Sequence, residues 1–146
     1  MQRHTLKIAN MEKSAEELYQ KAIDEGKQWF ARNRCAYNAL TIPFKTITWE
    51  KWLNHVNFPK VHKEVNNQYN SNTKFKQAFH DNITEFLTRY KKHNEHLQFD
   101  YDTGYALCLD YLKEECAWMC LFVEEKCEFE VYPSGRNKAM AVTYEF

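Results

Sequence analysis

The feature that most constrains the fold is a run of helical periodicity from Asp102 to Phe122, which is followed by an alternating pattern. Apolar side chains recur at helical spacing on one face of this run, at positions 105, 108, 109, 112, 116 and 119. Residues Cys127 to Tyr132 then alternate between two faces, as the residues of a half-buried strand do. The pattern predicts a long amphipathic helix, capped by Asp102 or Thr103, that leads into a strand.

A second stripe runs along the flank of this predicted helix, because Tyr111, Glu115, Trp118 and Phe122 recur at steps of four, three and four. A phenol and a carboxylate therefore lie one turn apart beside two aromatic rings. A carboxylate packed against such rings would lose solvation and could move protons, and the phenol could hydrogen-bond a substrate ammonium. From spacing alone, the favoured interpretation is simpler: a half-exposed tyrosine and a surface glutamate.

Caps and periodicity predict the remaining elements. Ser14 is the expected N-cap of a long helix, with Glu16 and Glu17 in its first turn. Pro59 is expected to begin a shorter helix, and the asparagine-rich stretch 66–73 is expected to form a turn. Helices are predicted over residues 14–40, 48–56, 59–69 and 74–92, and further strands over 44–48 and 139–146.

This order of helices and strands predicts an α/β layered domain. A length of 146 residues suits a single domain, which we expect to span residues 1–146. The sheet would contain about three strands. That is few for such long helices, as though part of the sheet were missing.

The net charge does not indicate a polyanionic partner, because 20 Lys and Arg residues balance 20 Asp and Glu residues. A local basic face is still possible on the first long helix. Lys21 and Arg32 share one flank of that helix, and Lys27 and Arg34 share another. Composition alone favours ordinary solvated charges, and a face that contacts phosphate groups is the alternative.

Several classes of site are excluded or disfavoured. Three glycines cannot build a phosphate-binding loop or a dinucleotide fingerprint, so no nucleotide cofactor is expected. The five cysteines lack the spacing of a zinc site and predict reduced, buried thiols, so no metal is expected. No apolar run approaches the roughly 20 residues of a bilayer crossing. Residues 1–7 do not form a signal peptide, so we expect a cytoplasmic protein with no membrane partner.

The chain resembles the tRNA-dependent cyclodipeptide synthases. The family's helix motif, Tyr-x-x-x-Glu, stands here as Tyr111-Leu-Lys-Glu-Glu115. One subfamily has a strand that ends in Tyr-Pro, which matches Tyr132-Pro133. The segments 3–27 and 47–50 are also similar to the family's pattern. Each motif is short, but their order and spacing agree over nearly all of the chain.

This resemblance implies a Rossmann-like domain related to the class I aminoacyl-tRNA synthetases. It implies a ping-pong reaction in which a serine accepts an aminoacyl group from one aminoacyl-tRNA. A second aminoacyl-tRNA then reacts, and the dipeptide cyclises to a diketopiperazine without a metal or a cofactor. By the same resemblance, Tyr111 holds the aminoacyl amine, Glu115 assists its proton transfers, and Tyr132 lies near the nucleophile.

The resemblance also implies that the long basic helix meets tRNA. The candidate contacts are Lys21, Lys27, Arg32 and Arg34, although they have no position-by-position match in the family.

The chain departs from the family in one respect. The family's serine lies early, in a loop of small residues after the first strand, and none of Ser14, Ser71 or Ser134 has that context. We therefore expect residues 1–146 to match the C-terminal two-thirds of the domain, incomplete at its N-terminal strands. A missing N-terminal segment would then be the partner that supplies the nucleophile. The alternatives are a catalytically inactive module that binds tRNA or a protein partner, and a purely structural helical protein.

Overall fold

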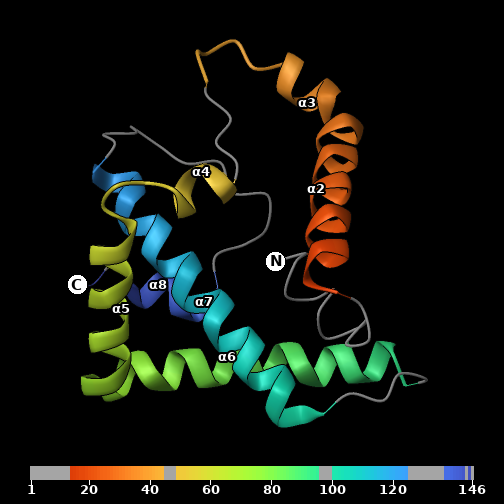
Figure 1. Ribbon diagram of the computed structural model, residues 1–146. Coiled ribbons are helices and arrows are strands. Elements are labelled where there is room, and N and C mark those ends of the chain that lie inside the picture. Colours follow the sequence, from red (N-terminus) through yellow and green to blue (C-terminus); the bar gives the residue numbers. More distant parts are fainter. Residues whose placement is uncertain (1–13, 45–48, 96–99, 125–136, 144, 146) are drawn as a thin grey trace. The chain divides into compact units, whose positions relative to one another are not determined.

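The computed structural model describes residues 14–44, 49–95, 100–124, 137–143 and 145, and the chain divides into two compact units, Met1–Ile47 and Thr48–Phe146 (Figure 1). The first unit contains α2 (Ala15–Arg32) and α3 (Arg34–Asn38). The second contains α4 (Trp49–Leu53), α5 (Phe58–Ser71), α6 (Thr73–His93), α7 (Tyr101–Glu124) and α8 (Lys138–Thr143).

The predicted α/β, Rossmann-like layered fold is wrong for the part of the chain that the structure describes, because every regular element there is a helix. The strand expected over 139–146 is replaced by α8. This helix buries Ala139, Met140, Val142 and Thr143, a spacing that suits one helical face and not the alternation of a strand. The strands predicted over 127–132 and over most of 44–48 lie outside the described residues.

Helix α2 begins at the predicted N-cap. The Ser14 hydroxyl accepts a hydrogen bond from the Glu17 backbone N–H at 3.3 Å, and the Glu17 carboxylate accepts one from the Ser14 backbone N–H at 3.0 Å. This capping box satisfies two amide groups at the start of α2. The predicted single helix to residue 40 is interrupted at Asn33. Its side-chain amide donates to the Trp29 carbonyl at 2.8 Å, where it competes with the backbone ladder.

The second unit is organised around α7, which contacts α4, α5, α6 and α8 (Figure 1). Residues 115–119 are all buried, so this part of α7 is enclosed on every side. The predicted apolar face is largely confirmed, because positions 108, 112, 116 and 119 are buried and positions 105 and 109 are half-buried. Asp100, and not the expected Asp102 or Thr103, caps the helix: its carboxylate accepts from the Thr103 backbone N–H at 2.7 Å.

Helices α5 and α6 are joined by a sharp turn at Asn72 (Figure 1). The Asn72 side chain accepts from the Phe75 backbone N–H at 3.1 Å and so caps α6. The wider asparagine-rich turn was a wrong prediction, because residues 66–71 continue α5. The periodicity of α6 is confirmed by its buried side chains, which are Phe75, Ala78, Phe79, Ile83 and Leu87.

This core generates a stability prediction. Phe79 is 0% exposed and packs against Phe75 and Tyr69 at ring-centroid distances of 4.8 and 5.5 Å. Phe79→Ala should lower the free energy of unfolding by about 3–5 kcal/mol, because it leaves a cavity in a packed core. Phe86→Ala on the same helix removes a half-buried ring and should cost clearly less. Urea unfolding followed by circular dichroism measures both, and equal losses would contradict the described packing of α6.

Candidate active site

Tyr111 and Glu115 are buried side by side on α7. Tyr111 is 8% exposed and Glu115 is 0% exposed. The Tyr111 hydroxyl donates a hydrogen bond to Glu115 Oε1 at 2.5 Å. The interpretation favoured from spacing, a half-exposed tyrosine beside a surface glutamate, is therefore wrong. The predicted pairing of the two side chains one turn apart is present in the structure.

Asn137 also contacts this carboxylate. Its side-chain Nδ2 donates to Glu115 Oε2 at 3.3 Å, so donors from α7 and from the start of α8 meet on one carboxylate. The sequence analysis did not identify Asn137. An N-cap signal was available, since asparagine precedes the apolar residues Ala139 and Met140, but no sequence pattern indicates that its amide reaches Glu115.

The aromatic end of the same stripe holds α4 against α7. Trp118 stacks on Trp52 with ring centroids 5.9 Å apart and an interplanar angle of 25°, and both rings are buried. Phe122 lies 6.4 Å from each of these two rings. The tryptophan pair therefore covers one flank of α7 next to Glu115, which contributes to the water-poor setting of the carboxylate.

Only some of the cysteines are buried. Burial raises the pKa of the Cys108 thiol to about 11, and it raises the pKa of Cys116 as well. These two thiols are therefore protonated near neutral pH, as a buried structural thiol should be. Cys35 on α3 is exposed, against expectation, and Cys127 lies outside the described residues. In the parts of the chain that are described, no group of three His, Cys, Asp or Glu side chains could hold a metal ion.

The predicted tRNA-contacting residues all lie in the first unit, and all four are exposed: Lys21, Lys27, Arg32 and Arg34. Lys21 and Arg32 lie eleven positions apart on α2 and so within about 20° of one another around its axis. Lys27 lies 3.7 Å from Asp24, an exposed pair that contributes little to stability. Arg34 follows the break at Asn33, so the flank predicted for Lys27 and Arg34 does not continue along one helix.

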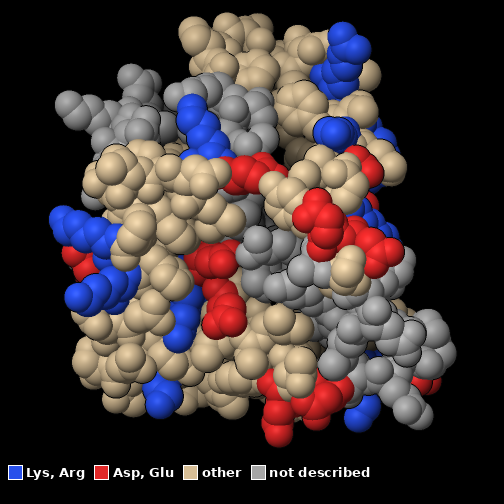
Figure 2. Space-filling model, viewed as in Figure 1, with Lys and Arg blue, Asp and Glu red and all other residues tan. Residues whose placement is uncertain are grey.

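Charge is separated along this first unit. Residues 14–44 contain four basic side chains and four acidic ones, the latter being Glu16, Glu17, Asp24 and Glu25. Residues 28–44 contain Arg32 and Arg34 and no acid. Figure 2 displays this separation on one face, with red side chains over the earlier part of α2 and blue ones near α3. Acidic side chains near the start of a helix and basic ones near its end also interact favourably with the helix dipole. The charge separation therefore has a structural explanation as well as a functional one.

An aromatic cluster, which the sequence analysis missed, lies in the same stretch of sequence as these arginines. Tyr37 stacks on Phe30 at a centroid distance of 4.6 Å, and it contacts Phe44 at 6.1 Å and Trp29 at 6.2 Å. Phe30 is 39% exposed and Phe44 is 52% exposed. Exposed rings beside arginines are the side chains on which unpaired bases stack. Aromatic residues seven positions apart, as at positions 30, 37 and 44, were the available signal.

The structure thus brings Tyr111 and Glu115 together and leaves the basic residues in the other unit. Tyr132, the third predicted site residue, lies outside the described residues. None of the described helices is long and apolar enough to cross a membrane.

Comparisons with known proteins find similarity to a solved structure. No family model and no curated protein matches the chain. Among solved structures, the chain is similar to a cyclodipeptide synthase (CDPS) from Fluoribacter dumoffii, with 49% sequence identity and a TM-score of 0.89. The match covers 99% of this chain and 64% of that enzyme, so the chain spans less than two thirds of its neighbour's length.

The burial of the cysteines gives a prediction that is independent of function. Cys35 should react with iodoacetamide far faster than Cys108 or Cys116, because it is exposed while the other two are buried and protonated. Peptide mass spectrometry after a short reaction at pH 8 measures the extent at each position. All three should react in denaturant. Equal labelling without denaturant would contradict the described packing of α7.

Proposed function

We propose that this chain is part of a cyclodipeptide synthase, which joins the aminoacyl groups of two aminoacyl-tRNAs into a diketopiperazine. The observation that carries the proposal is the buried hydrogen bond between Tyr111 and Glu115, in a chain that is 49% identical to a cyclodipeptide synthase. A buried carboxylate one turn from a buried phenol suits the handling of an amine that must lose a proton before it attacks an ester.

The proposed reaction assigns a role to each residue. A serine hydroxyl attacks the ester carbonyl of the first aminoacyl-tRNA, and the tRNA leaves as the ester C–O bond breaks. Tyr111 binds the ammonium of the aminoacyl group, and Glu115 is the base that takes up the proton when the amine becomes neutral. The neutral amine can then form an amide bond. In this proposal, Tyr111 and Glu115 are the side chains of this chain that bind the amine and transfer its protons.

Tyr132 and Pro133 support the further proposal that the enzyme belongs to the Tyr-Pro subfamily, with Tyr132 near the nucleophile. The motif is the only support for this assignment. The substrates that follow from the proposal are aminoacyl-tRNAs, and the reaction itself calls for no cofactor.

The first unit is the proposed tRNA contact. Lys21, Lys27, Arg32 and Arg34 are exposed, and the acid-free stretch 28–44 combines two of them with exposed aromatic rings. Cations bind phosphates, and rings stack on unpaired bases, which tRNA has at its 3′ end. The same observation favours a second candidate function, a tRNA-binding module without catalysis. The two candidates differ in whether product forms.

The activity test uses the complete natural protein expressed in bacteria, with diketopiperazines measured in the medium by mass spectrometry. Tyr111→Phe and Glu115→Gln should each lower the product by roughly 10²–10⁴-fold, because each removes a group that binds the amine or transfers its proton. Tyr105→Phe and Glu114→Gln change the same residue types on the same helix and should keep the product near the wild-type level.

The outcomes separate the two candidates. A wild-type protein that binds tRNA but yields no diketopiperazine supports the non-catalytic module. Product from the wild type together with full yield from Glu115→Gln would remove Glu115 from the proposed site.

The tRNA contact has its own test. Changing Arg32 and Arg34 together to Glu should weaken tRNA binding and make its salt dependence shallower by roughly 0.9 per lost phosphate contact. Filter binding over a series of salt concentrations measures the slope. Changing Lys91 and Lys92 on α6 to Glu is the matched control for net charge and should leave the slope unchanged. Equal effects of the two double variants would mean that no local contact exists at Arg32 and Arg34.

A further inference from the structure

The structure assigns to Asn137 the role of a positioning residue for Glu115. Its NH₂ group donates to one carboxylate oxygen and so holds the carboxylate with its other oxygen at the Tyr111 hydroxyl, where a proton can be transferred. This inference rests on the proposed function and adds to it a residue that acts through Glu115.

The orientation of the Asn137 amide follows from its partners. Its Oδ1 lies 2.8 Å from the backbone nitrogen of Met140. A backbone N–H can only donate, so the atom facing it must be the carbonyl oxygen. The NH₂ group therefore faces Glu115 Oε2, at 3.3 Å. The oxygen of the Asn137 amide therefore caps α8, and the nitrogen of the same amide donates to the Glu115 carboxylate.

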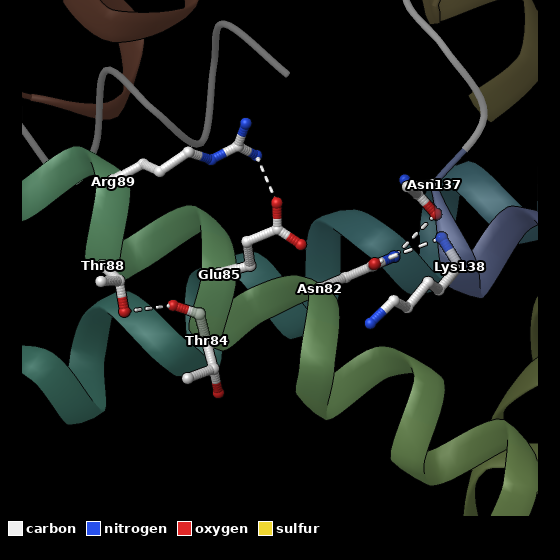
Figure 3. Close-up of polar contacts among 7 residues, drawn as sticks. All are labelled: Asn82, Thr84, Glu85, Thr88, Arg89, Asn137 and Lys138. Carbon is white, nitrogen blue, oxygen red and sulfur yellow. Dashed lines mark hydrogen bonds and ion pairs between the residues drawn. The ribbon is translucent and has the colours of Figure 1, made fainter.

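Asn82 on α6 reinforces this orientation. Its Oδ1 accepts from the backbone N–H of Lys138 at 3.2 Å, so its own NH₂ group faces Asn137 Oδ1, at 2.8 Å. Figure 3 shows Asn82 directed toward Asn137 and Lys138 at the start of α8. Two N–H groups thus donate to the Asn137 carbonyl, which polarises the amide and strengthens its NH₂ group as a donor. In each of these hydrogen bonds the donor lies farther from Glu115 along the chain of contacts than the acceptor, starting from the backbone of α8 and from Asn82 on α6.

The two oxygens of Glu115 consequently differ. Oε2 accepts a hydrogen bond from an amide that can donate but not accept, so a proton on the lone pair that faces this amide would point at another proton. Oε1 faces the Tyr111 hydroxyl at 2.5 Å, and a hydroxyl can donate or accept. Protonation of Oε1 reverses the Tyr111 hydrogen bond. The carboxylic acid then donates to the phenol oxygen.

This asymmetry gives a balanced proton transfer. The phenol proton of Tyr111 moves to Glu115 Oε1 while the phenol oxygen takes a proton from the substrate ammonium. One N–H bond breaks, one O–H bond forms at Glu115, and the Tyr111 O–H bond is exchanged. The amine becomes neutral, the carboxylate becomes an acid, and no oxidation occurs. Asn137 keeps its hydrogen bonds to Asn82, Met140 and Glu115 throughout, and it acts on the proton transfer through Glu115 alone.

Substitutions at Asn137 can separate positioning from capping. Asn137→Ser keeps a side-chain oxygen that caps α8 but removes the NH₂ group that reaches Glu115. Asn137→Asp also keeps the cap and places a second carboxylate against Glu115. We expect both variants to lower kcat of the complete natural protein by roughly ten-fold or more, with KM little changed. Asn72→Ser at the N-cap of α6 is the matched control and should retain wild-type kcat.

Unchanged kcat in Asn137→Ser and Asn137→Asp would overturn the positioning role and leave Asn137 as a helix cap. A second measurement covers the case in which the wild type makes no diketopiperazine. In protein labelled with ¹³C at glutamate carboxyls, Glu115→Gln identifies the Glu115 resonance by its loss. Asn137→Ser should shift that resonance and Asn72→Ser should not. A resonance that does not move in Asn137→Ser overturns the inference whatever the protein catalyses.

Discussion

The buried carboxylate of Glu115 is the constraint on which the second unit depends. A carboxylate without contact to water is costly unless donors replace its hydration. Tyr111 supplies one donor from the same helix, and Asn137 supplies another from the start of α8. Asn137 is held in turn by Asn82 on α6 and by the cap of α8. The hydrogen bonds of Glu115 therefore form only when α6, α7 and α8 pack together. The same packing is stable only because these hydrogen bonds replace the hydration of the carboxylate.

Sequence reasoning found the Tyr111–Glu115 pair but assigned it the wrong environment. A helical wheel gives the relative direction of side chains on one helix, and the step of four residues sufficed to pair the phenol with the carboxylate. How much of the circumference of a helix becomes buried depends on which other helices pack around that helix. Trp52 on α4 covers Trp118, and α8 contributes Asn137. Both helices are short, so neither has a periodicity long enough to identify its partner.

The same distinction explains the rest of the fold. The start of α2 and the core face of α6 were predictable, because a capping box and an apolar stripe of several turns are local signals. The error at 139–146 arose because a short apolar run fits a strand and a helix equally well. There the Asn137 cap and the burial of Ala139 and Met140 select the helix. The α/β layered fold was predicted from the order of the expected elements, and the resemblance added that it is Rossmann-like; the described helices do not bear this fold out.

The enclosed position of Glu115 is itself an argument for function. Apolar side chains of similar volume usually fill a helical core at no loss of stability, and often with a gain, compared with a buried charged group and its partners. The neighbours of Glu115 on α7 are residues of that apolar kind, Cys116, Ala117 and Met119. Tyr111 and Asn137 nevertheless both donate to this carboxylate, and Asn82 on α6 donates to Asn137 behind it. Stable packing does not require this arrangement. Proton transfer does require it, because the carboxylate must be held in one orientation beside a phenol with which it can exchange a proton.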